Sequence, residues 1–333
     1  MNCTHNIVSL RFGNKGGKGW LRVMTATWVA LCMQMGVAGC EEDAVGIDLN
    51  STSRAVVLSS VVQANHPIDV YVASSVSYND TASAAPINGT VITLHISGHQ
   101  PLSQTLDNDQ TTATFASCNA QSGDTIWLTV ATPSNTLQTT QSSILAAETV
   151  VPSITEILAV DTTTISSQNR LDMSLSLSDD PETTDFYQIE VRRRIFANGV
   201  ATDSLVKCEY TSIYFNLTSL NLSSDDNYIG LFDDELISGK ATLRFRAPWS
   251  SLRVGTDTLT ADSTAVVVRL LHHSEDYFTF LQSLIEAREF MQVPILGSTP
   301  LHSNVIGGYG ILGSSAFDEQ EFMVWRREET EGN

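Results

Sequence analysis

The sequence has little positive charge and few cysteines. Its 333 residues include 18 lysines and arginines against 37 aspartates and glutamates, and only five cysteines. This excess of acid argues against nucleic acid and against an anionic membrane surface as binding partners, because both repel a negatively charged protein. Hydrophobic residues make up 42% of the chain, which is enough for each half of it to bury a core.

A recognisable catalytic signature is also missing. The sequence has no G-x-S-x-G elbow of a serine hydrolase, and its histidines do not fall at zinc-binding spacings. We interpret His272 and His273 as surface residues beside a predicted helix. The acidic runs 225–227 and 233–235 offer oxygen ligands for calcium but lack the pattern of a calcium-binding hand, so we interpret them as solvated loops. We expect no catalytic residue, no cofactor and no metal; a carboxylate pair for glycoside cleavage is left open, because its separation is spatial.

One glycine-rich run resembles a nucleotide-binding motif in letters only. Residues 308–313 read G-Y-G-I-L-G and so match G-x-G-x-x-G. Dinucleotide binding requires a strand before this motif and a helix after it, within a βαβ unit. The run lies about 20 residues from the C-terminus in a β-rich region. We therefore interpret its glycines as backbone freedom for a tight turn or bulge.

The N-terminal segment has the pattern of an export signal. Residues 1–39 contain four basic residues and no acid, and an apolar stretch runs roughly from Val23 to Gly39. The stretch ends in Val-Ala-Gly-Cys at residues 37–40, which matches the lipobox of bacterial lipoproteins, where the cysteine takes a diacylglycerol. We expect Cys40 to be lipidated and the mature chain to be anchored to a membrane without crossing it. The alternative is an ordinary signal peptide followed by a chance cysteine.

Three acids follow the cysteine directly. Glu41, Glu42 and Asp43 resemble the surface-export signal of lipoproteins in the Bacteroidota. The alternative is a solvated acidic start to a flexible tether. Without residues 1–39 the chain has 14 basic residues against 37 acidic ones, a formal charge of −23. That charge suits a body that its lipid holds at a membrane while the chain itself stays in water.

The remaining cysteines do not define a disulfide. Cys3 and Cys32 leave with the predicted signal, and Cys40 is taken by lipid. Export would permit a bridge between Cys118 and Cys208. Because they fall in different predicted domains, a bridge and two separate thiols both remain open.

The dominant hydrophobic period is two, which predicts half-buried strands. The clearest alternations lie at residues 68–72, 92–96, 126–130 and 171–177. About seven such strands within roughly 100 residues predict an immunoglobulin-like β-sandwich at 54–150. A lipidated tether at 40–53 precedes it, and 148–157 is interpreted as a hinge. The rest, 151–333, is predicted to be a second β-sandwich or partly open barrel with one amphipathic helix.

That helix is expected near residues 275–291. The apolar residues recur at helical spacing: Tyr277, Phe280, Leu281, Leu284 and Ile285. Ser274 can cap the helix start, and acids in the first turn favour its dipole. Pro294 prevents much extension.

Four stretches resemble a known family. They are 180–187, 232–240, 276–284 and 303–313. Through them the chain is similar to domain of unknown function family 4249, lipoproteins of the Bacteroidota. The family tends to close with Ser-Asn, a Gly-Gly pair and Gly-Ile-Phe-Gly, and the matching residues here are Ser303, Asn304, Gly307, Gly308, Gly310 and Gly313, with Leu312 in place of phenylalanine.

The resemblance implies an outer-membrane lipoprotein, often encoded beside a TonB-dependent receptor, with no assigned catalytic residues. We therefore expect a non-enzymatic accessory of a TonB-dependent transport system for nutrient capture or uptake. Its partners would be the membrane, through the lipid anchor, and that receptor. Two alternatives stay open: a surface hydrolase acting on glycan or peptide, and an adhesin or cell-surface assembly module.

Overall fold

The computed structural model describes most of the chain after the predicted tether. The described residues are 55–76, 84–107, 109–118, 120–133, 144–165, 170–197, 200–207, 211–212, 230–237, 239–248, 261–291 and 300–326. They belong to one compact unit, Thr52–Asn333. No helix in these ranges is long and apolar enough to cross a membrane. The predicted signal at 1–39 and tether at 40–53 lie outside the described residues.

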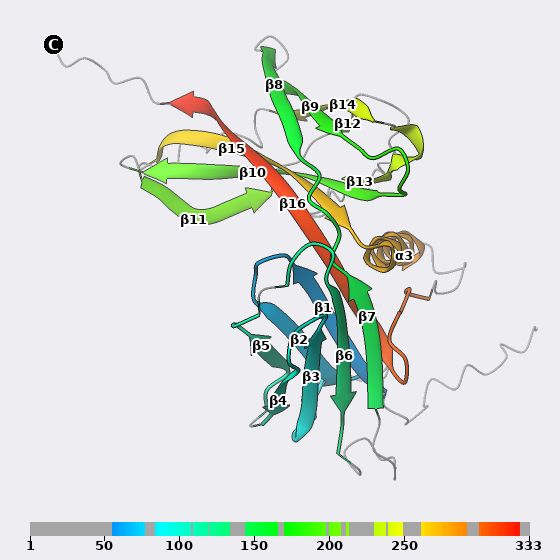
Figure 1. Cartoon of the computed structure of the whole chain (residues 1–333). Helices are drawn as coiled ribbons and strands as arrows, with labels where there is room; N and C mark the ends of the chain where they lie inside the picture. Colours follow the sequence, from blue (N-terminus) through cyan, green and yellow to red (C-terminus); the bar gives the residue numbers. More distant parts are fainter. Residues whose placement is uncertain are drawn as a thin grey trace, which may run out of the picture. The chain divides into compact units, whose positions relative to one another are not determined.

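The described chain is mainly β, with one α-helix, as predicted (Figure 1). The first half contains β1 (Val56–Gln63), β2 (Ile68–Ser74), β3 (Thr90–Ile96), β4 (Leu102–Leu106), β5 (Thr112–Phe115), β6 (Thr125–Ala131) and β7 (Ile144–Val150). The second half contains β8 (Ile157–Ile165), β9 (Arg170–Ser178), β10 (Phe186–Ala197), β11 (Val200–Lys207), β12 (Thr211–Ser212), β13 (Gly230–Asp233), the 3-10 helix η2 (Asp234–Leu236), β14 (Lys240–Pro248), β15 (Ala261–His273), helix α3 (Glu275–Met291) and β16 (Tyr309–Arg326).

These strands form three sheets, one of which serves both halves of the chain. The long sheet has the order β11-β10-β15-β16-β1-β2-β5, and β13 pairs with β10 beside this path. The other two sheets have the orders β4-β3-β6-β7 and β12-β14-β9-β8. Neighbouring strands are antiparallel except β1 and β16, which run parallel.

The first half is the predicted immunoglobulin-like sandwich. The strands β3, β6 and β7 face β1, β2 and β5 across one core. The alternating residues at 68–72, 92–96 and 126–130 all place their apolar members in this core. Their polar neighbours lie on the outer faces, because successive side chains of a strand point to opposite sides.

The second half is a further sandwich of curled sheets. Its core contains the alternating residues of β9, at 171–177, and residues of β14 from the same sheet. These pack with residues of β10, β13 and β15 from the long sheet. Strand β15 is hydrogen-bonded on both edges and buried along residues 263–268 and 270–273, so neither of its faces is in water. The segment 151–156 connects the two cores at the place where the sequence predicts a hinge.

Helix α3 confirms the predicted helix, with a different buried face. Phe278, Leu281 and Ile285 form its buried side, and Tyr277 and Phe280 pack at the rim. The main-chain oxygen of Ser274 accepts a hydrogen bond from the Phe278 amide at 3.0 Å. Its hydroxyl, predicted to cap the helix, instead accepts one from the Ser314 amide of β16 at 3.1 Å. This serine therefore ties the helix to the long sheet.

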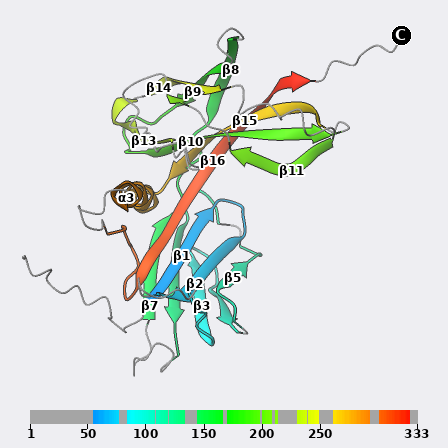
Figure 2. The same ribbon diagram turned by 180° about the vertical axis from the view of Figure 1, so that it is seen from behind.

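Strand β16 links the two cores. Its first residues, from Tyr309 to Ser315, pair with β1, and those from Ser315 to Arg326 pair with β15. Both views show one continuous ribbon passing along both sets of strands (Figures 1 and 2). Leu312 of this strand and Val305 just before it pack in the first core, although they come from the far end of the chain. The division into 54–150 and 151–333 stays a prediction; the structure adds that both halves share β16.

Candidate functional site

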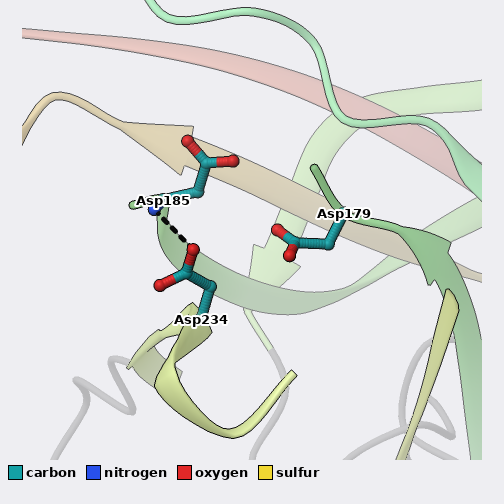
Figure 3. Close-up of side chains that lie close together, drawn as sticks. All are labelled: Asp179, Asp185 and Asp234. Atoms are coloured by element: carbon teal, nitrogen blue, oxygen red, sulfur yellow. Dashed lines mark hydrogen bonds between the residues drawn. The ribbon is translucent and has the colours of Figure 1, made fainter. Parts of the chain in front are cut away.

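Three aspartates from separate segments gather at one end of the second sandwich. Asp179 directly follows β9, Asp185 directly precedes β10, and Asp234 opens η2. One carboxylate oxygen from each lies within 4.8 Å of the other two. Figure 3 shows the three side chains lying close together on three different stretches of ribbon. We call this group the aspartate cluster.

Main-chain hydrogen bonds fix the three segments. The Asp185 amide donates to Asp234 Oδ2 at 3.0 Å, and the Asp234 amide donates to the main-chain oxygen of Asp185 at 3.1 Å. The Asp179 amide donates to the oxygen of Gly239 at 2.9 Å. The pairing of β10 with β13 continues up to Phe186 and Asp233, so both strands deliver their acids at the same end. The cluster thus lies where these hydrogen bonds join the ends of β9, β10 and β13.

Asp179 is the buried member of the cluster. Only 6% of the residue is exposed. Its Oδ1 accepts a hydrogen bond of 2.7 Å from the Tyr187 hydroxyl, while its Oδ2 is buried without a hydrogen-bond partner. Burial raises the pKa of the Asp179 carboxyl; the Tyr187 bond opposes this shift, and the charges of Asp185 and Asp234 add to it. Burial likewise raises the pKa of Tyr187, so its hydroxyl remains a donor.

His272 is the one positively ionisable group in contact with these carboxylates among the described residues. Its Nε2 lies 3.2 Å from Asp185 Oδ1, and its Nδ1 lies 2.9 Å from the main-chain oxygen of Ser153. The ring also packs against Tyr187, with centroids 5.1 Å apart. The imidazole therefore orients Asp185 from the side of the core.

The interpretation of His272 and His273 as surface residues is wrong. They are 6% and 2% exposed, because β15 is paired on both edges and covered on both faces. As neighbours in a strand they point to opposite sides. His273 faces the helix: its Nε2 lies 2.9 Å from Gln188 Oε1, and its ring meets Tyr277 edge-on. Burial lowers the pKa of His273 to about 3, and the neighbouring His272 contributes to the shift.

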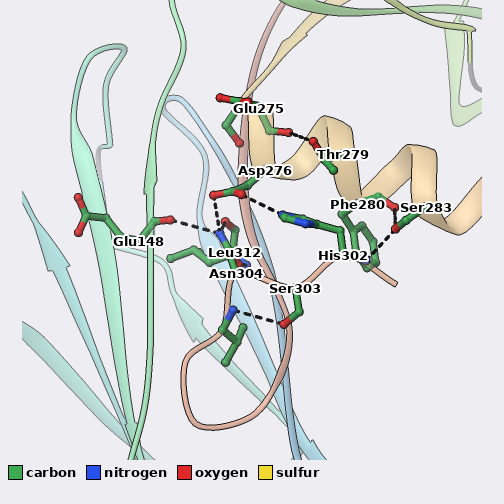
Figure 4. Close-up of polar contacts among 12 residues, drawn as sticks. Glu148, Glu275, Asp276, Thr279, Phe280, Ser283, His302, Ser303, Asn304 and Leu312 are labelled. Carbon is green, nitrogen blue, oxygen red and sulfur yellow. Dashed lines mark hydrogen bonds and ion pairs between the residues drawn. The ribbon is translucent and has the colours of Figure 1, made fainter. Parts of the chain in front are cut away.

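A second polar group surrounds the loop before β16. We call it the Ser303–Asn304 junction. The Asn304 amide group bonds both main-chain groups of Leu312, donating to its oxygen at 2.9 Å and accepting from its N–H at 2.9 Å. It also donates to Asp276 Oδ2 in α3 and to the main-chain oxygen of Glu148 in β7 (Figure 4). One side chain thus takes the place of a neighbouring strand.

Other side chains complete the junction. His302 Nε2 lies 2.9 Å from Asp276 Oδ1, and the His302 amide donates to the Ser283 hydroxyl at 2.9 Å. The Ser303 hydroxyl accepts from the Gly310 amide at 3.0 Å. These bonds join α3, β7 and the start of β16. The predicted family residues Ser303 and Asn304 therefore hold the fold together rather than form an open pocket.

The sequence predicts that the glycines of this stretch serve a tight turn or bulge; the structure adds that Gly310 and Gly313 lie where a side chain would not fit. Gly310 has φ +123°, and a Cβ there would lie 1.7 Å from the Leu58 oxygen of β1. At Gly313 a Cβ would lie 2.6 Å from the Tyr277 Cβ, because α3 crosses β16 at that point. Gly307 (φ +84°) and Gly308 lie in the turn into the strand. The run 308–313 enters a strand instead of a helix, so it lacks the setting of a dinucleotide site.

Several predicted residues lie elsewhere or outside the described ranges. Cys40, the export triplet 41–43, Cys208 and the acidic run 225–227 are not among the described residues. Cys118 is a buried free thiol, and burial raises its pKa. In the run 233–235 the structure gives two of the three acids definite roles. Asp233 accepts from the Glu235 amide at the start of η2. Asp234 joins the cluster, so the solvated-loop interpretation is wrong for Asp234.

The sequence reasoning did not single out Asp179 and Asp185. A signal was nevertheless present, because two of the four resemblance stretches, 180–187 and 232–240, meet at the aspartate cluster. The other two, 276–284 and 303–313, meet at the Ser303–Asn304 junction. Stretches far apart in the chain thus pair in space.

The fold and these two polar groups define a mainly β protein in which two sandwiches share one long sheet. A family model, described as "Domain of unknown function (DUF4249)", matches residues 42–321. The chain therefore belongs to the DUF4249 family. A comparison with curated proteins gives no match.

Solved structures with fibronectin-type domains resemble it at low similarity. A two-domain fibronectin type III segment of chicken tenascin has a TM-score of 0.20 and 8% identity, covering 66% of this chain and 90% of that one. The FN1–FN3 domains of chicken CNTN1 have a TM-score of 0.26 and 10% identity; the match covers 81% of this chain and 66% of that one. The α-L-rhamnosidase of Aspergillus terreus has a TM-score of 0.31 and 14% identity. The match covers 66% of this chain and only 27% of that enzyme.

Proposed function

We propose that this protein is a lipoprotein of the outer membrane, held by Cys40, and a non-catalytic accessory of a TonB-dependent transporter in nutrient capture or uptake. The observation that carries the proposal is the Val-Ala-Gly-Cys sequence at 37–40, placed at the end of a basic and apolar export signal. Membership of the DUF4249 family supports the proposal. Resemblance to that family implies an outer-membrane lipoprotein, often encoded beside a TonB-dependent receptor. That the protein is a lipoprotein of the Bacteroidota is part of the same proposal.

The chain between the anchor and the fold supports a tethered arrangement. Fifteen residues, 41–55, lie between Cys40 and Val56, the first residue of β1. Fully extended, such a segment spans about 50 Å, at roughly 3.3 Å per residue. The formal charge of −23 after residue 39 keeps the folded part away from an anionic bilayer surface. Acyl chains on Cys40 would anchor it, since each buried methylene contributes about 0.8 kcal/mol.

Tethering gives a physical reason for an accessory role. A protein confined to the membrane that holds its receptor meets it at a much higher effective concentration than a free one. The two filled cores make the sandwiches rigid supports for the loops that extend from them. A receptor or nutrient would accordingly be met by those loops and by the outer faces of the sheets.

The lipid anchor is tested first. The N-terminal peptide of protein from the native host is analysed by mass spectrometry for wild type, Cys40→Ser and Cys32→Ser. We expect diacylglycerol on Cys40 in wild type and in Cys32→Ser, which retains the lipobox, and no lipid and no cleavage at this site in Cys40→Ser. A wild-type peptide with a bare Cys40 thiol would refute the anchored protein altogether.

The accessory role needs a separate test. Tagged protein is extracted from native outer membranes in mild detergent after brief crosslinking, and its partners are identified. We expect a TonB-dependent β-barrel to copurify with wild type and to be lost with Cys40→Ser. Replacing Glu41, Glu42 and Asp43 by alanine should protect the protein from protease added to whole cells. If no barrel copurifies and deletion leaves nutrient uptake unchanged, the accessory role is wrong even where the anchor is right.

A further inference from the structure

We propose that the aspartate cluster is a binding site for a divalent cation, and specifically for Ca²⁺. The ligands are carboxylate oxygens of Asp179, Asp185 and Asp234, which approach from three segments and converge in Figure 3. This site does not depend on the lipid anchor or on any receptor.

The distances fit calcium. Ca²⁺ binds oxygen at about 2.3–2.6 Å, so two ligands on opposite sides of one ion are up to about 5 Å apart. The three oxygens all lie within 4.8 Å of one another, so one such ion placed among them would meet all three at or close to its usual bond length. Mg²⁺ binds oxygen at about 2.0–2.1 Å, which limits opposite ligands to about 4.2 Å and demands near-octahedral order. Ligand type agrees, since three carboxylates suit a hard cation.

An unpartnered buried atom is the second observation. Asp179 is 6% exposed, and its Oδ2 has no hydrogen-bond partner, although nearly all buried polar atoms in proteins have one. The Asp179 carboxylate points toward the side where the other two acids lie (Figure 3). A cation placed among the three would give this oxygen its partner and would compensate the negative charge that three adjacent carboxylates bring into a poorly hydrated place.

The surrounding hydrogen bonds orient the ligands without using them up. Tyr187 donates to Asp179 Oδ1 and leaves Oδ2 free. The Thr183 hydroxyl donates to Asp185 Oδ2 at 2.9 Å, and the Asp185 amide donates to Asp234 Oδ2. Each carboxylate oxygen has two lone pairs, so an oxygen that accepts one hydrogen bond can still bind a metal. Outer partners of this kind are the usual support of metal ligands.

The ion would connect the loop between β9 and β10 to the segment that carries η2. Both are held at present by the few main-chain bonds described above. Extracellular calcium modules bind with dissociation constants of about 10⁻⁴–10⁻³ M, and the proposed export of this chain would place the site in a comparable setting. The cation would then be a structural one that orders this end of the second sandwich.

The test is a titration of the full-length protein in mild detergent. After treatment with EDTA and its removal, CaCl₂ is titrated by isothermal calorimetry into wild type, Asp179→Asn, Asp234→Asn and Asp161→Asn. Asp161 is an exposed acid of β8, so its replacement makes the same charge change outside the cluster. We expect one Ca²⁺ per chain in wild type and in Asp161→Asn, with affinities within twofold, and at least tenfold weaker binding in the other two.

Each possible result of the titration either supports or overturns the cation site. Asp234 is only half-buried, so Asp234→Asn should fold and can still be titrated if Asp179→Asn does not fold. Absence of Ca²⁺ binding in wild type, or equal affinity in all four proteins, overturns the site. Equal affinity of wild type for MgCl₂ overturns the assignment to calcium. A Cys40→Ser protein should bind Ca²⁺ as wild type does, so failure of the lipid anchor and failure of the cation site are distinguishable.

Discussion

Replacing Gly310 by alanine should break the contact between the first and last strands of the described chain. Gly310 pairs with Leu58 across the parallel ladder of β1 and β16. An added Cβ would lie 1.7 Å from the Leu58 oxygen, whereas real Cβ atoms essentially never come closer than 3.0 Å. Relief needs a movement of about 1.3 Å by a strand that is paired on its other edge as well. The backbone angle, φ +123°, adds strain for any residue with a side chain.

The expected cost follows from these two parts. A non-glycine residue in a sparsely populated backbone region costs about 1–3 kcal/mol. Shifting the ladder sacrifices one or two of its hydrogen bonds, at about 1 kcal/mol each. We therefore expect Gly310→Ala to lower the free energy of unfolding by about 2–5 kcal/mol.

Guanidinium unfolding followed by circular dichroism measures this loss. The matched control is Gly98→Ala: Gly98 also has a positive φ, +75°, but its added Cβ meets no atom within 4 Å. Strain alone then predicts a loss of about 1–2 kcal/mol for the control. Equal losses in the two variants would show that β1 and β16 do not approach as closely as described, and the reasoning about Gly310 would fail.

Three further predictions concern single side chains. Asn304→Ala leaves the N–H and oxygen of Leu312 without their partner and should cost about 2–3 kcal/mol in denaturant unfolding, against less than about 1 kcal/mol for the exposed Asn88→Ala. Because the folded pKa of His273 is lowered to about 3 from 6.5, its contribution to stability is fully present above pH 6.5 and declines as the pH falls toward 3, at up to about 1.4 kcal/mol per unit. His273→Gln should remove that decline from unfolding free energies measured across the range, and an unchanged pH profile would contradict its burial. The buried Cys118 thiol should resist iodoacetamide in native protein and react only on unfolding, as peptide mass spectrometry would show; rapid native labelling would disprove the packing around it.

The strands were predictable because their pattern is local. In β9 the residues Leu171, Met173, Leu175 and Leu177 are all buried, as a period of two requires. Helix α3 was also predictable, but its buried face was not. Phe278 is buried in the place expected for Phe280, because the fold sets where the helix rests on β16 and β10. The period of the apolar residues identifies a helix or strand, but the strands or helices packed against it decide which of its faces is buried.

The long sheet and both polar groups depend on pairings that no local pattern contains. Nothing within residues 309–326 indicates that one strand will serve two cores, since its partners lie about 250 and 50 residues earlier. Asp179 and Asp185 approach Asp234 only once β10 pairs with β13. For the same reason His272 and His273 were misjudged, because the strands on either side of β15 come from distant segments.

The shared strand has a consequence for the order of folding. A ribosome synthesises β16 about 250 residues after β1, yet the open edge of β1 is completed only by β16. Until β16 has been made, therefore, the N-terminal sandwich carries an unsatisfied strand edge, which is a template for pairing with another chain. A chain that stops before residue 309 would leave that edge exposed for good, so a truncated product should aggregate rather than survive as a stable half.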